Sequence, residues 1–229
     1  MQMHELSEWS SNIMDAQKIV VISAGLGTPS SSRLLADQLG DATARRAAGF
    51  GIEARVTTYE LRDLAVDIAN NFVTGFAAPK LAEAIEDVER ADALVVVSPV
   101  FSASYSGLFK SFFDLIDNKA LEGKPVLLGA TGGSQRHSMV LDFAMRPLFS
   151  YLRARIMPTA VFAAPMDWGQ SADGDLGGAG DLTSRLERAA AELAAELVHD
   201  GGASAAPKVA TRPEDKSFEE LLADLTSGR

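Results

Sequence analysis

Residues 18–33 read KIVVISAGLGTPSSSR, a short apolar run that leads into a turn rich in glycine and hydroxyl groups. The run is β-branched and almost continuously apolar, which is typical of a strand buried on both faces of a parallel sheet. Serines 30–32 lie at the start of an apolar-periodic stretch, where hydroxyl side chains commonly cap a helix. The stretch therefore predicts the first strand, turn and helix of an α/β domain.

Further strands and helices alternate after this unit. Two runs, ALVVVS at residues 93–98 and PVLLGA at 125–130, are equally apolar, and weaker strand patterns cover residues 52–59 and 156–163. Helices are expected at residues 31–48, 79–90, 107–117, 135–154 and 181–198. Pro147 should bend or interrupt its helix. The alternation predicts an α/β, flavodoxin-like three-layer sandwich with a five-stranded parallel sheet of order 2-1-3-4-5.

The chain divides into one domain and two terminal segments. We expect an N-terminal extension at residues 1–17, the domain at 18–199, and a flexible linker followed by a short amphipathic helix at 200–229. Residues 61–76 are an extra segment, expected to be either a helix over the site or a subunit contact. The N-terminus lacks a signal-peptide pattern, and no apolar run is long enough to span a membrane. A cytoplasmic protein without a membrane partner is expected.

The composition excludes several classes of function. The 229 residues contain no cysteine and three histidines, and the formal net charge is −10. Thiol nucleophiles, iron–sulfur clusters and thiolate zinc sites are therefore excluded, and the histidines lack the spacing of metal ligands. No metal site is expected. The acidic balance also argues against a nucleic-acid partner.

Three loops follow strands that meet where the strand order reverses, which is where ligands bind in such sheets. The first loop combines two glycines with four hydroxyl side chains ahead of a helix N-terminus, a pattern suited to phosphate, to which Arg33 could add a charge. The second, SPVFSASYSG at residues 98–107, offers small residues and one aromatic ring that could lie against a planar group. The third, ATGGS at residues 130–134, lets the backbone approach a ligand closely. Each loop alone has a structural alternative: a capped helix, core packing or a Gly-Gly turn.

Together these motifs resemble the NAD(P)H-dependent FMN reductases of the flavodoxin-like family. The resemblance covers roughly residues 18–198 and is nearest to the FMN reductases that accompany luciferase-like flavin-dependent monooxygenases. It implies that the FMN phosphate meets Gly25, Leu26, Thr28, Ser30, Ser31 and Ser32. It implies that the isoalloxazine lies along Pro99, Val100, Phe101, Ser102 and Ala103, with its pyrimidine edge toward Thr131, Gly132 and Gly133. Two departures are visible: Ala24-Gly25 replaces Gly-Ser, and Phe101 replaces a tyrosine.

The activity that the resemblance implies is hydride transfer from NADPH or NADH to flavin N5, which supplies reduced flavin to a partner monooxygenase. Because the two nucleotides perform this chemistry, no catalytic side chain is named. A homodimer or homotetramer is implied as well. His137 is expected to face solvent or to be hydrogen-bonded rather than to donate a proton, and Arg146, Arg153 and Arg155 are expected to be surface or subunit contacts rather than a 2′-phosphate site. Three alternatives stay open: an FMN-bound reductase of quinones, azo dyes or oxyanions, a non-catalytic flavodoxin-type electron carrier, and a flavin-binding or interaction module that has lost catalysis.

Overall fold

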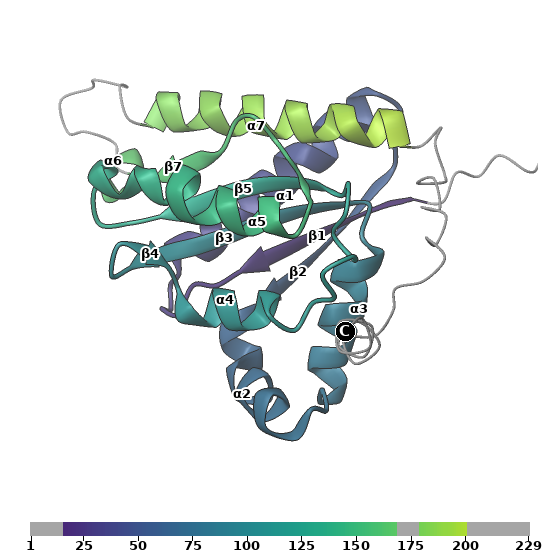
Figure 1. The fold of residues 1–229 in the computed structure, drawn as a ribbon. Helices are drawn as coiled ribbons and strands as arrows, with labels where there is room; N and C mark the ends of the chain where they lie inside the picture. Colours follow the sequence, from purple (N-terminus) through teal and green to yellow (C-terminus); the bar gives the residue numbers. More distant parts are fainter. Residues whose placement is uncertain (1–15, 169–178, 201–229) are drawn as a thin grey trace, which may run out of the picture.

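The computed structural model describes residues 16–168 and 179–200 (Figure 1). The linker and C-terminal helix expected after residue 200, and nearly all of the N-terminal extension, lie outside the described residues. The division into domain and terminal segments therefore stays a prediction.

In the described residues, seven strands form one sheet whose main path runs β2-β1-β3-β5-β6. The strands of this path are β1 (Gln17–Ser23), β2 (Ala54–Glu60), β3 (Ala93–Phe101), β5 (Pro125–Thr131) and β6 (Arg155–Ile156). Each is parallel to its neighbour. Counted by the five expected strands, this is the order 2-1-3-4-5, so the predicted fold is confirmed. The order reverses between β1 and β3, whose carboxyl ends reach the same edge.

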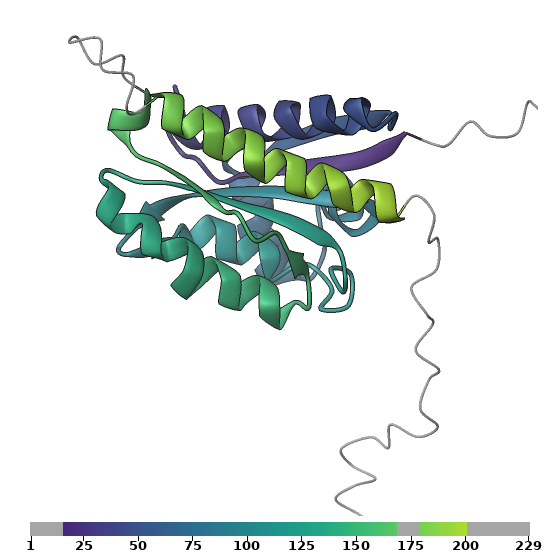
Figure 2. The ribbon, with the colours of Figure 1, turned by 90° about the horizontal axis from the view of Figure 1, so that it is seen from above.

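Helices cover both faces of the sheet (Figures 1 and 2). On one face α1 (Ser31–Gly49) and α7 (Ala179–Asp200) lie side by side, and on the other lie α3 (Pro79–Arg90), α4 (Gly107–Phe113) and α5 (Arg146–Tyr151). Strand β1 explains this arrangement, because its side chains alternate between the two apolar cores. Ile19 and Val21 pack into the core beneath α1 and α7, whereas Val20 and Ile22 pack into the core beneath α3 and α4. A strand buried on both faces is what the opening apolar run predicted.

The extra segment after β2 is helical. It forms the short 3₁₀ helix η1 (Leu61–Leu64) followed by α2 (Ala65–Thr74). Apolar side chains of Val66 and Val73 on α2 are exposed, whereas Ile68 is buried in the core. The segment is thus anchored by one face and presents apolar groups on the other.

The fifth expected strand is divided into β6 and β7 (Val161–Ala163), both paired with β5. The cause is local. Pro158 has no N–H group to donate to the ladder, and the Thr159 amide donates to the Glu192 carboxylate on α7 over 2.8 Å instead. The strand prediction was right in place but missed this interruption.

The helix expected over residues 135–154 is not uniform. It consists of the 3₁₀ helix η2 (Gln135–Met139), the π-helical turn η3 (Leu141–Met145) and α5, in whose first turn Pro147 lies. The interruption expected at Pro147 takes the form of a change from π-helical to α-helical winding and not of a break, since Met145 and Arg146 both keep helical backbone and Pro147 lies in the first turn of α5. Helix α4 also stops at Phe113, four residues earlier than expected, because the chain turns there.

Candidate functional site

A cavity of about 740 Å³ opens at the carboxyl edge of the sheet, where the strand order reverses. Its walls come from four segments that follow β1, β3, β5 and β7. The lining residues are Pro29, Ser30, Ser31, Leu34, Pro99, Val100, Phe101, Thr131, Gly132, Gly133, Ala163, Pro165 and Trp168. Three loops that are far apart in the sequence therefore meet at one site, as the sequence predicted.

The first loop is shaped by Ser30, which caps helix α1. Its backbone is extended, and its Oγ accepts a hydrogen bond from the Arg33 amide over 3.1 Å. Gly25 makes this conformation possible, because a Cβ at that position would overlap the Ser30 hydroxyl. The capping oxygen accepts its bond from the helix and so keeps its own hydrogen for a ligand.

A buried hydrogen bond joins the first loop to the third. The hydroxyl oxygens of Ser32 and Thr131 lie 2.7 Å apart, and both side chains are almost fully buried. Ser32 therefore supports the loop from beneath, whereas Ser31 is exposed and lines the cavity. The four hydroxyl groups of the first loop, which were all expected to bind phosphate, thus have different surroundings.

Arg33 does not supply the charge that the sequence suggested. Its guanidinium bonds both carboxylate oxygens of Asp37 at 2.8 Å and Glu60 at 2.8 Å. The hydrogen bond with Asp37, assisted by the charges of both carboxylates against the effect of burial, raises the pKa of Arg33. This cation is therefore held by its own acidic partners on the side of α1.

The second loop is a tight hairpin. Strand β3 turns back into the two-residue strand β4 (Ser104–Tyr105), and the turn residues Ser102 and Ala103 have φ values of 47° and 64°. Side chains disfavour this left-handed region, and such strain is often found at ligand sites. The hairpin leaves Phe101 46% exposed at the mouth of the cavity.

The fourth wall was not predicted from the sequence. It is the short helix α6 (Pro165–Trp168), which begins directly after β7. Asp167, only 3% exposed, accepts from the Ala164 amide over 2.7 Å and from the Arg185 guanidinium on α7 over 2.8 Å. These bonds fix α6 and so place Trp168 against the cavity. A tryptophan five residues after the end of the fifth strand was the available signal.

The predicted site residues divide into two groups. Eight line the cavity, and the others lie in the same loops but outside its lining. The lining group is Ser30, Ser31, Pro99, Val100, Phe101, Thr131, Gly132 and Gly133. The group outside the lining is Gly25, Leu26, Thr28, Ser32, Ser102 and Ala103. A ligand that reaches from the first loop to the third would pass along both groups.

The other residues considered as candidates from the sequence, three arginines and His137, lie outside the lining of the cavity. Arg146 bonds Asp142 at 2.7 Å and the Met157 and Pro158 carbonyl oxygens. Arg153 and Arg155 lie near the amino end of β5, opposite the cavity, and pair with acidic side chains. The surface interpretation of these arginines therefore holds. His137 is exposed and packs beside Gly132 at the rim.

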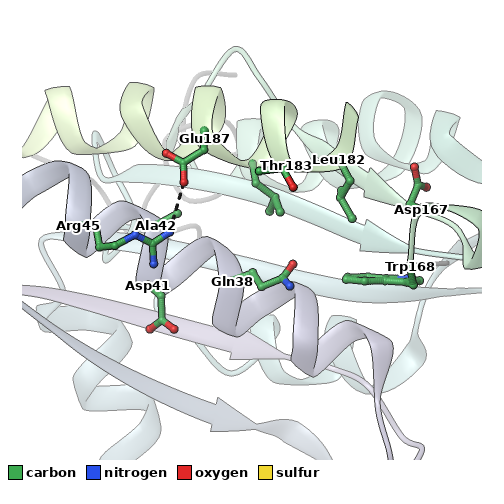
Figure 3. Close-up of a pocket in the computed structure, with 10 residues that line it drawn as sticks. Gln38, Asp41, Ala42, Arg45, Asp167, Trp168, Leu182, Thr183 and Glu187 are labelled. Carbon is green, nitrogen blue, oxygen red and sulfur yellow. Dashed lines mark hydrogen bonds and ion pairs between the residues drawn. The ribbon is translucent and has the colours of Figure 1, made fainter. Parts of the chain in front are cut away.

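A second hollow of about 380 Å³ lies between α1 and α7 (Figure 3). Its walls carry Asp41, Asp167 and Glu187, and Arg45 points toward Glu187 across a 3.3 Å ion pair. Arg46 also bonds Glu187, and these arginines lower the pKa of its carboxyl group. With its cation paired and acidic groups in excess, this hollow is unsuited to a phosphorylated ligand. The cavity at the sheet edge is the better candidate.

The described residues offer neither a metal site nor a membrane-spanning helix. No cluster of three or more histidine, aspartate or glutamate side chains in these ranges has the geometry of a metal site. Among the same residues, no helix combines the length and apolar character that crossing a membrane requires.

Fold and site together define a flavodoxin-like α/β protein with a ligand cavity at the switch point of its sheet. Comparison with known proteins then identifies the family. The model of the NADPH-dependent FMN reductase family matches residues 17–169, and the chain belongs to that family of flavin oxidoreductases.

Individual relatives agree with this assignment. The chain is 40% identical to an FMN reductase (NADPH) of Pseudomonas aeruginosa over 66% of its own length and 78% of the relative's. It is 36% identical to the NADH-dependent FMN reductase SfnF of Pseudomonas fluorescens, over 78% and 88% of the two chains. The structure of an oxidoreductase from Corynebacterium diphtheriae, 44% identical, superposes with a TM-score of 0.75 over 80% of this chain and 98% of the other.

Proposed function

We propose that this protein catalyses hydride transfer from NADH or NADPH to FMN in the cavity at the sheet edge, and that it releases the reduced flavin to a flavin-dependent monooxygenase. The observation that carries the proposal is the meeting of the three predicted loops around one cavity of about 740 Å³. This volume lies within the range of about 300–1,000 Å³ that is usual for small-molecule sites.

The first loop suits the FMN phosphate. Ser30 accepts from the backbone of α1, so its hydroxyl hydrogen can be donated to a phosphate oxygen. Ser31 is exposed at the cavity and offers a second hydroxyl group. The N-terminus of the nineteen-residue helix α1 adds free N–H groups and a favourable dipole. An anion could thus be held without a lysine.

The opposite walls suit a planar ring. Pro99, Val100 and Phe101 form one side of the cavity, and Gly132 and Gly133 bring backbone close to its edge. Trp168 supplies a further aromatic wall. We infer that these groups orient the isoalloxazine and leave one of its faces open to the nicotinamide, near Phe101.

The chemistry supplied by bound FMN is the acceptance of a hydride at its N5 atom. The protein's own part is to position the two nucleotides and to stabilise negative charge by backbone N–H groups near Thr131 and Gly133. We infer no acid–base residue, and His137 at the rim has no part in this proposal.

The proposal also covers the hydride donor, the oligomeric state and the partner protein. Because one relative is named for NADPH and another for NADH, we leave both donors in the proposal. We propose a cytoplasmic homodimer or homotetramer, and the exposed apolar side chains of Phe72, Val73 and Phe76 in and after α2 are candidates for the subunit contact. The partner monooxygenase is inferred from the resemblance alone.

Steady-state oxidation of NADH and of NADPH, followed by the loss of nicotinamide absorbance, tests the proposal. We expect oxidation that requires added FMN and reduced flavin that passes through an ultrafiltration membrane that retains the protein. FMN binding without oxidation of either donor would contradict it and favour an electron carrier. Oxidation that proceeds only with an added quinone would favour a reductase with tightly bound flavin.

A further inference from the structure

Loop residues 24–30, which we propose to hold the FMN phosphate, contain no lysine or arginine. The first cation beyond the loop, Arg33, is held by Asp37 and Glu60. A guanidinium nevertheless reaches this loop from another part of the chain, in η1. We propose that Arg62 fastens the phosphate loop and makes the site prefer FMN to riboflavin, an inference that rests on the proposed function.

The contact is direct. Arg62 Nη1 donates to the Gly27 carbonyl oxygen over 2.7 Å and to the Thr28 hydroxyl oxygen over 2.6 Å. Both acceptors belong to the exposed part of the loop, where neither glycine nor threonine is anchored by burial. One guanidinium group thus holds two successive residues of the loop.

Sheet topology places Arg62 there. Strands β1 and β2 are parallel neighbours, and Ser23 pairs with Glu60 at their carboxyl ends. The two chains therefore leave the sheet side by side, and Arg62 lies two residues beyond that pair. Its Nη2 also forms an ion pair with Glu60 at 3.0 Å, and its side chain is only 27% exposed. The ion pair with Glu60 therefore orients the guanidinium toward the loop.

This geometry serves a phosphate in two ways. Thr28 accepts from Arg62, so its hydroxyl hydrogen is available to a phosphate oxygen. Arg62 also limits the negative charge near the loop, because Arg33 and Arg62 together face the three carboxylates of Asp37, Glu60 and Asp63. Loss of Arg62 would make the net charge of this group more negative by one beside a phosphate dianion. Riboflavin has no phosphate and should not sense the difference.

The test compares FMN and riboflavin binding, measured by quenching of flavin fluorescence, for wild type and Arg62→Gln. We expect the Kd for FMN to rise about tenfold and the Kd for riboflavin to stay within about twofold. Arg90→Gln is the matched control, because this substitution removes the same charge. Arg90 pairs with Glu86 on the exposed side of α3. The control variant should change neither Kd.

Arg62→Lys guards against a variant that fails to fold. It keeps the charge, but an ammonium group has a single nitrogen and cannot bond Gly27 and Thr28 while a second nitrogen of the same planar group pairs with Glu60, so we expect a smaller loss that is still confined to FMN. Equal weakening of both flavins, or no change for either, would overturn the inference. Wild type that binds FMN and riboflavin equally would overturn it too while leaving the reductase proposal intact. Wild type that binds neither flavin would remove the proposed function itself.

Discussion

The hydroxyl oxygens of Ser32 and Thr131 lie 2.7 Å apart in a buried position, although 99 residues separate them in the chain. Ser32 lies in the first turn of α1 and Thr131 ends β5, so this bond joins the two loops that enclose the cavity from opposite sides. Strand β3 lies between β1 and β5 in the sheet. The bond therefore spans the end of β3 and fixes the separation of the walls.

Breaking this bond should cost stability. Ser32→Ala or Thr131→Val leaves a buried hydroxyl without its partner, and we expect each to lower the free energy of unfolding by about 1 to 2 kcal/mol. The double variant should cost less than the sum of the two, because the second change removes an already unpaired group. Urea unfolding of the four proteins measures the coupling, and strict additivity would show that the two hydroxyl groups act independently.

Gly25→Ala should disrupt the first loop. Its Cβ would overlap the Ser30 hydroxyl, so the N-cap of α1 must rotate away. We expect a loss of about 1 to 2 kcal/mol in unfolding free energy and at least about tenfold weaker FMN binding. Gly49→Ala is the control, because a Cβ there meets nothing within 4 Å. If both variants bind FMN like wild type, the role given to the first loop is wrong.

The sequence predicted the sheet order and the three loops because these depend on local patterns. The apolar run at residues 18–23 specifies a strand buried on both faces, and the flavodoxin order favoured by five parallel strands places it beside residues 93–98. The resemblance to FMN reductases, and not these patterns alone, named the eight residues that line the cavity, and it did not give their contacts.

What the sequence did not reveal depends on contacts between distant segments. Arg62 reaches Gly27 only because β2 lies beside β1, and Trp168 faces the cavity only because Arg185 on α7 holds Asp167. The division of the last strand depends on Glu192, which bonds the Thr159 amide. None of these partners is indicated by the residues next to it in the chain.

Ala103→Gly should stabilise the protein. Ala103 has a φ of 64° in the β3–β4 turn, a conformation that glycine adopts without steric cost. We expect a gain of about 0.5 to 1 kcal/mol in thermal or urea unfolding. Ala48→Gly, within α1, should show the opposite sign, a loss of about 1 kcal/mol. Destabilisation by Ala103→Gly would contradict the strained turn.

Lys124 should make stability depend on pH. Its ammonium group donates to the carbonyl oxygens of Val88, Glu89 and Ala91, and burial lowers its pKa from 10.5 to about 8. Between these values the unfolded chain binds more protons at this site than the folded one. The contribution of Lys124 to stability must therefore increase as the pH rises through that window.

The difference in unfolding free energy between wild type and Lys124→Met measures this contribution. We expect it to shift in favour of wild type by no more than about 1.4 kcal/mol per pH unit as the pH is raised from about 7.5 to about 9.5. Lys80→Met, an exposed site on α3, is the control and should show no such trend. A constant difference for Lys124→Met would mean that its pKa is not lowered.

The most direct test of the central claim is FMN titration followed by tryptophan fluorescence. The chain has two tryptophans, and Trp9→Phe leaves Trp168 at the cavity wall as the single emitter. If FMN binds between the three loops, Trp168 emission should fall to a saturating limit with one flavin per chain, and NADH or NADPH should then bleach the bound flavin. Unchanged Trp168 emission at FMN concentrations that support turnover would contradict the placement of the flavin in this cavity.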